Sequence, residues 1–224
     1  MSTAVATQGG SYRAGVRAAA PILPAAAVFG ASFAVLARAA DFDPVAAVVM
    51  SATTFAGSAQ FAAASILDDG GGVAAAIATA ILLNARYAAI SISVGQLFRG
   101  LPWRRVAEAQ LIVDESWALS SRGEGRFDRL VLLGAGAALW VAWTGGTAVG
   151  ALVGETIGDP NALGLDGAFP ALFFALLLAQ LTGPYQRLAS LGGAAIALVL
   201  IPITSPGVPV IAACAACAIG WWRR

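Results

Sequence analysis

The stretch VAAAIATAILLNARYAAISISVGQLF, residues Val73–Phe98, is almost entirely apolar but carries an arginine, Arg86, at its middle. About 20 apolar residues are enough for a helix to cross a bilayer. An arginine at the centre of such a helix costs roughly 2.5–3.5 kcal/mol on insertion, so it is normally held by a polar partner. The stretch therefore predicts a membrane helix in which Arg86 either takes part in function or is tied to carbonyl groups at the end of another helix.

Polar side chains follow two faces of this predicted helix. Thr79, Arg86 and Ser93 recur every seven residues and share one face. The other polar face carries Asn84, Tyr87 and Ser91. Because neither face suits lipid, we expect the helix to lie inside a bundle or to be locally unwound.

Six further apolar stretches make the chain an integral membrane protein. Hydrophobic residues are 59% of its 224 residues and charged residues 11%, which is more apolar surface than one soluble core needs. Backbone groups in hydrocarbon must pair within helices or a closed barrel, and no alternating pattern supports a barrel. We predict an all-α, polytopic membrane helix bundle with about seven hydrophobic segments, at least one of them broken or re-entrant. The other stretches are Ala18–Ala37, Val45–Leu67, Leu130–Val153, Ala168–Leu181, Leu188–Ile203 and Val208–Trp222.

The chain is expected to form one transmembrane domain over residues 13–224, after a polar tail over residues 1–12. Arg13 and Arg17 before the first apolar stretch resemble the start of a signal peptide, but the stretch is too long and further spans follow, so we interpret it as a retained helix. Trp103–Ser121 has one apolar and one charged face. It predicts an amphipathic helix that lies on the membrane surface or completes a short span.

The arginines indicate the orientation of the chain, because cytoplasmic loops carry an excess of basic residues. If Val45–Leu67 dips into the membrane and returns, and Trp103–Ser121 stays at the surface, eleven of the thirteen arginines are cytoplasmic. If both segments span the membrane, eight arginines are cytoplasmic and four are external. Charge favours the first arrangement and the length of Val45–Leu67 favours the second. Both place the N- and C-termini in the cytoplasm.

The composition excludes most catalytic and binding chemistries. All thirteen basic residues are arginine, and the chain has no lysine and no histidine. It therefore lacks the lysine of a phosphate-binding loop or a Schiff base, and the histidine of a catalytic triad, zinc site or haem site. Cys214 and Cys217 lie in an apolar stretch, where packing is expected rather than metal binding. With a formal net charge of +1 and no basic run interleaved with aromatics, we expect no nucleic-acid partner, and we expect no cofactor or metal.

A polar sequence, FAGSAQF over residues 55–61, interrupts Val45–Leu67. Gly57 and Ser58 at membrane depth predict a helix break, where unpaired N–H groups and the positive end of the helix dipole bind a carboxylate. Gln60 adds both a donor and an acceptor. The alternative is that these small residues let two helices pack closely.

Asp114 and Glu115 form an acidic pair in an apolar context. If one carboxylate is partly buried, it pairs with Arg86, binds an ammonium group or takes up a proton. If Trp103–Ser121 lies at the membrane surface, Glu115 is simply solvated.

Four short motifs follow one another along the chain. They are Phe55-Ala56-Gly57-Ser58-Ala59-Gln60-Phe61, Asn84-Ala85-Arg86-Tyr87, Asp114-Glu115-Ser116-Trp117 and Gly164-Leu165-Asp166-Gly167-Ala168-Phe169-Pro170-Ala171. Together they resemble the AzlC/YgaZ family, the large subunit of bacterial branched-chain amino-acid exporters. The resemblance runs from about Arg13 to Leu178, and the first two motifs are the specific ones. Val113 and Tyr87 depart from the family pattern, which often has Thr or Ser before the acidic pair and in several members His after Asn-x-Arg.

The resemblance implies a multi-pass protein of the bacterial cytoplasmic (inner) membrane that exports valine, leucine, isoleucine and similar hydrophobic amino acids. It also implies a small, four-span AzlD/YgaH-type membrane subunit as partner. Such a secondary transporter is expected to use alternating access around a site near the bilayer midplane. We expect proton coupling through Asp114, with Glu115 beside it, and facilitated exit is the alternative.

A zwitterionic amino acid needs polar partners for its two charged groups and an apolar surface for its side chain. Backbone N–H groups at the break, an arginine and an amide are expected to bind the carboxylate. A second amide and an aspartate are expected to bind the ammonium, and three phenylalanines the side chain. The residues assigned to the carboxylate are Gly57, Ser58, Arg86 and Gln60. Those assigned to the ammonium are Asn84 and Asp114, and those assigned to the side chain are Phe55, Phe61 and Phe169.

Two other functions are alternatives. One is a small-ion channel constricted by Arg86 and the helix break. The other is a non-transporting membrane scaffold whose polar residues fasten helices to a partner. We do not expect an enzyme, because the two carboxylates are adjacent in sequence and leave no second pair for an intramembrane hydrolase.

Overall fold

The computed structural model describes residues 10–123, 125–157, 174, 177–178, 181, 183–204 and 208–217. Within these ranges the fold is helical, with one isolated β-bridge between Ser121 and Phe127. The all-α prediction is therefore confirmed for the described residues. The elements are α1 Tyr12–Ala19, α2 Leu23–Ala39, α3 Pro44–Thr54, α4 Gly57–Asp68, α5 Val73–Asn84, α6 Arg86–Val94, η1 Gly95–Leu97, α7 Pro102–Ala109, α8 Asp114–Ser120, α9 Arg129–Ile157, α11 Pro184–Leu200, α12 Val208–Ala213 and η3 Cys214–Cys217.

Two described helices are long and apolar enough to cross a membrane. One is Val73–Leu97, formed by α5, α6 and η1, and the other is Arg129–Val153 within α9. A third span results if α1 and α2 act as one bent pair. The seven predicted segments are thus confirmed only in part, and most of Ala168–Leu181 lies outside the described residues.

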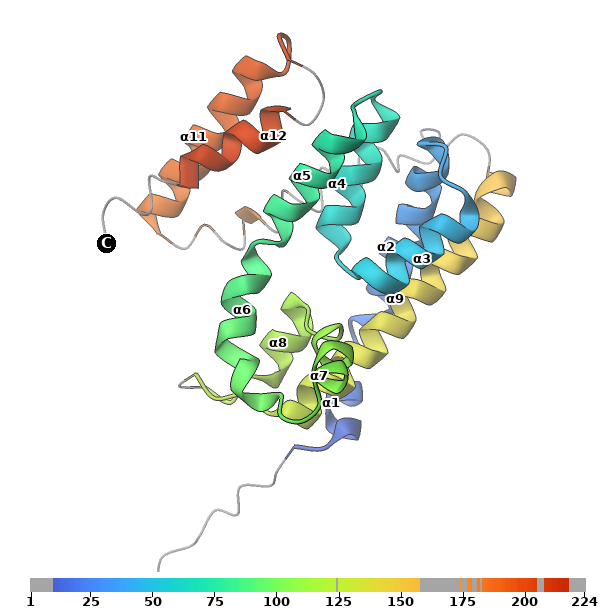
Figure 1. The fold of residues 1–224 in the computed structure, drawn as a ribbon, viewed down its shortest axis with the longest axis vertical. Helices are drawn as coiled ribbons and strands as arrows, with labels where there is room; N and C mark the ends of the chain where they lie inside the picture. The colour runs from blue at the N-terminus through green and yellow to red at the C-terminus, as the bar shows by residue number, and fades with distance from the viewer. Residues whose placement is uncertain are drawn as a thin grey trace, which may run out of the picture.

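The long helix α9 passes through the molecule, and α1, α2, α3 and α8 pack against it (Figure 1). Its contact with α2 is close because glycines lie on both helices. A Cβ on Gly30 would collide with the carbonyl oxygen of Trp143, and one on Gly146 would collide with that of Ala27. Small residues of this kind let membrane helices approach each other.

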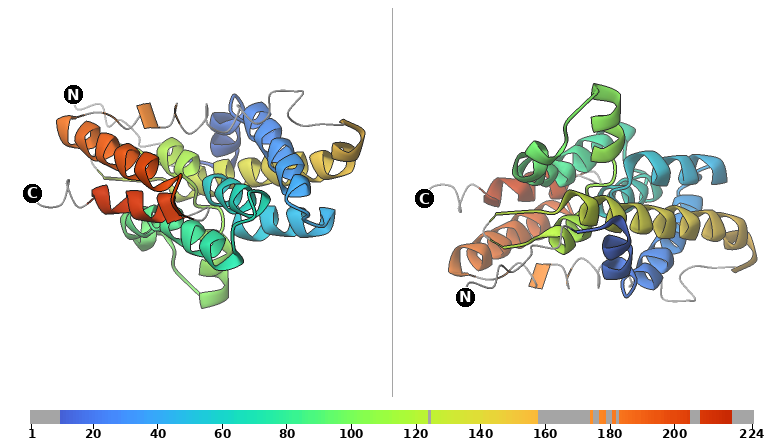
Figure 2. Two further views of the ribbon diagram at one scale, coloured as in Figure 1. Left: turned by 90° about the horizontal axis from the view of Figure 1, so that it is seen from above. Right: turned by 90° about the horizontal axis from the view of Figure 1, so that it is seen from below.

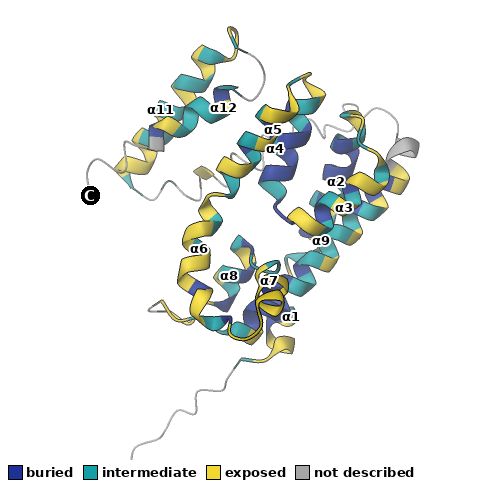
Figure 3. Ribbon diagram, in the orientation of Figure 1, coloured by how far each residue is buried: buried dark blue, intermediate teal, exposed yellow. Residues whose placement is uncertain are grey.

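Burial is uneven across the helices. Buried residues gather on α2, α4 and the first half of α9, whereas α5 and α6 are largely exposed (Figure 3). The helices α11 and α12 pack on each other and lie to one side of α9 (Figures 1 and 2). Of the polar residues of Val73–Leu97, Thr79 is buried and Arg86, Ser91 and Ser93 are exposed, so the described part of this chain encloses the polar faces only in part.

The first apolar stretch is not the single helix that the sequence predicted over Ala18–Ala37. It is divided into α1 and α2, which are bent by 68°. Pro21 explains the bend, since a proline lacks the N–H that a continuous helix needs and clashes with the preceding turn. Pro24 lies in the first turn of α2, where that N–H has no intrahelical partner in any case.

The stretch Val45–Leu67 is broken, as the sequence predicted. The helix α3 ends at Thr54 and α4 begins at Gly57. Between them Phe55 has φ 41° and ψ 48°, a left-handed conformation that few residues other than glycine adopt. In Figure 1, α3 runs down to the break and α4 runs back up from it, so the two helices fold back on each other.

The helix around Arg86 is interrupted at Ala85, where α5 ends and α6 begins. The N–H of Ala85 donates to the carbonyl of Leu82, a spacing tighter than that of an α-helix. Ala85 keeps a right-handed helical conformation, with φ −57° and ψ −27°, so Val73–Leu97 remains one apolar span with a tight turn at its middle.

The prediction of one amphipathic helix over Trp103–Ser121 is wrong, because α7 and α8 are separate. The hydroxyl of Ser116 accepts the N–H of Val113 at 2.9 Å and donates to the carbonyl of Leu111 at 2.9 Å. A serine that satisfies nearby backbone groups in this way competes with the helical pattern. The break places Asp114 at the start of its own short helix.

Candidate functional site

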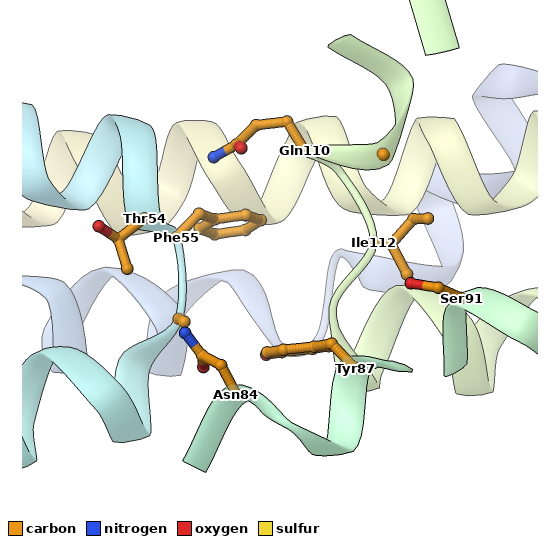
Figure 4. A pocket seen from close by; sticks show the side chains of 9 residues that line it. Thr54, Phe55, Asn84, Tyr87, Ser91, Gln110 and Ile112 are labelled. Atoms are coloured by element: carbon orange, nitrogen blue, oxygen red, sulfur yellow. The ribbon is translucent and has the colours of Figure 1, made fainter. Parts of the chain in front are cut away.

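A cavity of about 190 Å³ lies at the break between α3 and α4, bordered by α5, α6 and the linker from α7 to α8. Figure 4 shows Asn84 and Tyr87 on one side of it and Gln110 on the other, with Phe55 between them. The lining residues are Thr54, Phe55, Ala56, Asn84, Tyr87, Ser91, Ala109, Gln110 and Ile112. The cavity thus offers hydroxyl, amide and apolar surfaces together.

The amide oxygen Oδ1 of Asn84 is buried and has no hydrogen-bond partner among the residues that the structure describes. An acceptor buried without a partner costs roughly 1–3 kcal/mol. Since Asn84 lines the cavity, a ligand that donates a hydrogen bond there removes this cost.

Arg86 lies beside the cavity and contacts side chains from two other helices. Its Nη2 donates to the hydroxyl of Ser58 at 3.0 Å and lies 2.9 Å from Oδ2 of Asp114. Its guanidinium carbon lies 5.2 Å from the centre of the Tyr87 ring, a cation–π distance. The helices α4, α6 and α8 therefore meet at Arg86, and the pairing with Asp114 that the sequence offered as one alternative is confirmed.

The first turn of α4 faces the same break. No side chain caps this helix, so the N–H groups of its first turn have no intrahelical partners and carry the positive end of the dipole. An added Cβ on Gly57 would lie 2.7 Å from Cη2 of Trp143. The Gly57-Ser58 pair therefore lies at a break, as predicted, and also allows close packing, while carboxylate binding at this break stays a prediction.

Gln60 and Phe61 lie behind the break rather than on the cavity surface. Gln60 accepts the N–H of Ala56 at 3.3 Å and donates to the hydroxyl of Ser51 at 2.9 Å. The Phe61 ring packs edge-on against Trp143, with 5.9 Å between ring centres. From these positions both residues stabilise the break by internal contacts.

Among the predicted phenylalanines, Phe55 lines the cavity. Phe169 and the rest of the motif over residues 164–171 lie outside the described residues. Of the nine residues predicted to bind a substrate, Phe55 and Asn84 line the cavity, and Ser58 and Asp114 each contact Arg86.

Sequence reasoning missed Gln110 and Trp140. The Gln110 amide donates to the carbonyls of Ala52 at 3.2 Å and Thr53 at 2.8 Å, and the Trp140 indole donates to Ala52 at 2.9 Å. The last carbonyls of a helix lack intrahelical partners, so these two side chains fix the end of α3. The only sequence signal for Gln110 was an amide within an otherwise apolar run.

Glu115 follows Asp114 in the first turn of α8. The pKa of its carboxyl group is raised above the ordinary value, first because the surrounding protein reduces its hydration and also because Asp114 carries the same charge. Its own backbone N–H and Arg86 act in the opposite direction without cancelling the shift. Within the described ranges, no three His, Cys, Asp or Glu side chains gather where they would hold a metal ion.

Apolar spans indicate an integral membrane protein, and a broken helix next to a polar cavity is an arrangement in which transporters form substrate sites. The chain belongs to the AzlC family, since the family model described as AzlC protein matches residues 21–157.

Relatives along most of the chain agree with this membership. An uncharacterized membrane protein of Archaeoglobus fulgidus is 35% identical over 215 residues, 94% of each chain. An uncharacterized membrane protein of Helicobacter pylori is 26% identical over 156 residues, 68% of each chain. The branched-chain amino acid transport protein AzlC of Bacillus subtilis is 25% identical over 190 residues, 80% of this chain and 73% of that protein. No solved structure matches the chain. The family and these relatives give the protein a role in membrane transport.

Proposed function

We propose that this protein is a secondary transporter that exports branched-chain or similar hydrophobic L-amino acids across the cytoplasmic membrane. It is coupled to protons and works with a small AzlD/YgaH-type membrane subunit. The observation that carries the proposal is Arg86, which contacts Ser58 at the start of α4 and Asp114 on α8, next to the cavity. The name of the Bacillus subtilis relative supports the substrate class.

The substrate carboxylate takes the place of Asp114 on Arg86. A guanidinium binds a carboxylate through two parallel hydrogen bonds, which is stronger than the single contact with a neutral hydroxyl. The Ser58 hydroxyl and the first N–H groups of α4 lie on the same side and add donors for the carboxylate.

The ammonium group of the substrate is met by oxygen atoms. Asn84 Oδ1 is the buried acceptor in the cavity wall, and the carbonyl oxygen of the protonated Asp114, released from Arg86, is a second acceptor. Phe55, Ala109 and Ile112 supply an apolar surface for the side chain. This division favours a small hydrophobic amino acid over a charged one, because none of the described residues that line the cavity is charged.

Proton coupling acts through the Arg86–Asp114 pair. A proton on Asp114 removes the negative charge that holds Arg86, so the guanidinium becomes available to the substrate carboxylate. Loss of that proton restores the pair and displaces the substrate. Glu115, whose raised pKa favours proton uptake, supplies a second carboxyl group on the same short helix.

The small subunit has exposed apolar surface to contact. In the most apolar window of Val73–Leu97 only 11% of the residues are buried inside the described chain. Lipid and a partner subunit together cover such a surface in a membrane.

Efflux from intact cells tests the proposal. Cells that lack their own exporters are given this chain with its small subunit and are challenged with a valine-containing dipeptide. Intracellular valine should fall with the wild-type chain and should accumulate with Arg86→Ala. Arg187→Ala, which replaces an exposed arginine on α11, is the matched control and should export normally.

The membrane level of each variant is measured by immunoblotting. An Arg86→Ala variant that is present at a normal level and exports valine at the wild-type rate would contradict the proposal. Ion conductance without movement of valine would favour a channel instead.

A further inference from the structure

In the short helix α7 the one buried residue is an acid, Glu108, while its apolar residues are exposed. Glu108, on the inner side, is 9% exposed and binds Arg104 and Arg129. Trp103 and Val106 are 70% and 71% exposed. At 100° per residue, the pair Trp103 and Val106 lies nearly opposite Glu108.

This arrangement is the reverse of a surface helix in water, which places its apolar stripe against the core. The inner side of α7 is instead held by an ion pair to the start of α9. Leu101, the residue before α7, is also apolar and is 61% exposed. The outward face therefore requires an apolar environment outside the described chain.

The direction of α7 fits a helix that lies in the membrane interface. Figure 1 looks along the axis of α7, whereas the spanning helix α9 runs across the page, and Figure 2 shows the α7 segment protruding sideways. Helices parallel to the membrane plane bury such a face in the boundary between headgroups and acyl chains. Tryptophan is enriched at this depth because its ring has an apolar body and a polar N–H.

Exposed arginines accompany the outward face. Arg104 and Arg105 lie on either side of Glu108, about 100° from Trp103 and Val106 respectively, and Arg99 precedes the helix with an exposed side chain. The charge of Glu108 is already matched by Arg129 and Arg104, so it does not neutralise Arg99 or Arg105. The rim of the face is therefore basic.

We propose that α7, with Arg99 and Leu101 before it, is an interfacial helix that binds anionic phospholipid headgroups. Trp103 and Val106 enter the acyl-chain boundary, and the arginines contact the phosphates. Basic residues beside a membrane attract anionic lipids electrostatically, which favours lipid over a protein partner as the occupant of this face. Gln110 follows α7 directly and binds the end of α3, so the proposed lipid-binding helix lies next to the cavity.

Tryptophan quenching by brominated lipids tests the proposal on the full chain in lipid nanodiscs. The contribution of Trp103 is the difference between wild type and Trp103→Phe, since the chain has six tryptophans. Brominated phosphatidylglycerol should quench this component at a lower lipid fraction than brominated phosphatidylcholine with the same chains. In Arg105→Gln the half-maximal fraction of phosphatidylglycerol should rise roughly fivefold, and in the control Arg13→Gln on α1 it should stay unchanged.

Three results would overturn the proposal. If no brominated lipid quenches the Trp103 component, the face is covered by protein or lies in water. If both headgroups quench it at the same fraction, the face does not select anionic lipid. If Arg13→Gln shifts the titration as much as Arg105→Gln, the attraction belongs to the whole molecule and not to α7. The fluorescence of the other tryptophans verifies that each variant is folded.

Discussion

An arginine in a membrane span must be compensated, and at position 86 two partners do so. Asp114 supplies a charge at 2.9 Å and Ser58 a hydroxyl at 3.0 Å. Both partners leave part of the guanidinium accessible, since 42% of the Arg86 side chain is exposed. A purely structural arginine is expected to be enclosed by its partners, whereas this one remains open to a ligand.

Asn84 is the residue whose replacement tests the ammonium position. Asn84→Ala removes the buried Oδ1 acceptor, and hydrogen bonds to charged groups contribute about 1.5–3 kcal/mol. We expect the KM for export to rise roughly tenfold or more, with little change in the maximal rate. Export assays over a range of intracellular valine concentrations measure both quantities.

The control for this prediction is Gln96 on η1, which carries the same amide group, is exposed and does not line the cavity. Gln96→Ala should keep the wild-type KM, because its amide lies away from the proposed ammonium position. An unchanged KM in Asn84→Ala would remove Asn84 from the site.

At the scale of elements, the α3–α4 break is held on both sides. Gln110 and Trp140 bind the last carbonyls of α3. Gln60 binds Ala56 within the break and Ser51 on α3, and the Ser51 hydroxyl lies 2.8 Å from that of Thr147 on α9. Because hydrogen bonds from several elements hold the end of α3 and the break, the position of the first turn of α4 is fixed.

Gln110→Glu tests whether the end of α3 must be fixed for transport. The substitution keeps the size of the side chain but replaces its N–H donors with a carboxylate that faces two carbonyl oxygens. We expect a raised KM for valine at a normal membrane level, because the break is displaced. Gln110→Asn, which keeps the donors on a shorter chain, should recover part of the affinity, and equal behaviour of Gln110→Glu and wild type would contradict this role.

The start of α9 is capped by Asp128. Its carboxylate accepts N–H groups of Leu130 at 3.0 Å and Val131 at 3.1 Å, and also that of Gly10 at 2.6 Å. Burial alone would raise the pKa of Asp128, but these hydrogen bonds and the charge of Arg122 outweigh burial and hold the pKa below its usual range. The cap therefore joins the N-terminal segment to the longest helix.

Asp128→Asn should lower the stability of the purified protein by about 1 kcal/mol at neutral pH. Because the folded-state pKa is depressed, the carboxylate stabilises the fold above the ordinary Asp pKa of about 3.9, and this stabilisation is lost as the pH falls through the folded value. Thermal unfolding measured against pH should show the wild type converging on the variant in acid. Asp69→Asn in an exposed turn is the control, and a gap between wild type and Asp128→Asn that does not narrow in acid would contradict the prediction.

At the scale of the whole molecule, the sequence predicted the features that follow from local chemistry. An arginine in apolar sequence needs a partner, and Asp114 was a candidate because it also lies in apolar sequence. The break at Gly57 was also predictable, because the Gly57-Ser58 pair interrupts an apolar run.

Features that depend on tertiary contact were not predictable. The division of Trp103–Ser121 is local, but the periodicity of the segment gave no signal for a Ser116 hydroxyl that binds the backbone of Val113 and Leu111. The role of Gln110 depends on the end of α3 arriving beside it. Gln60 and Phe61 were assigned to the site by their place in a motif, but a motif does not tell which of its side chains face the cavity and which face the core.

The orientation of the chain is a prediction at this scale. Because α3 and α4 fold back at their break (Figure 1), the turn before α5 is expected on the outer side, as in the re-entrant arrangement. Asp69→Cys in that turn, in a background without Cys214 and Cys217, should react with a membrane-impermeant maleimide on intact cells. Ser121→Cys, beside the basic loop before α9, should react only after permeabilisation. Reaction of Asp69→Cys only after permeabilisation would contradict the re-entrant arrangement.

Leucine binding to the purified protein with its small subunit is the most direct test of the claim that Arg86 receives a substrate carboxylate. Isothermal titration is carried out with leucine and with isopentylamine, which has the same apolar chain and an ammonium group but no carboxylate. The account predicts that the wild type binds leucine and not isopentylamine, and that Arg86→Gln loses leucine binding while its thermal unfolding is unchanged. Tight binding of leucine to a folded Arg86→Gln protein would contradict the account.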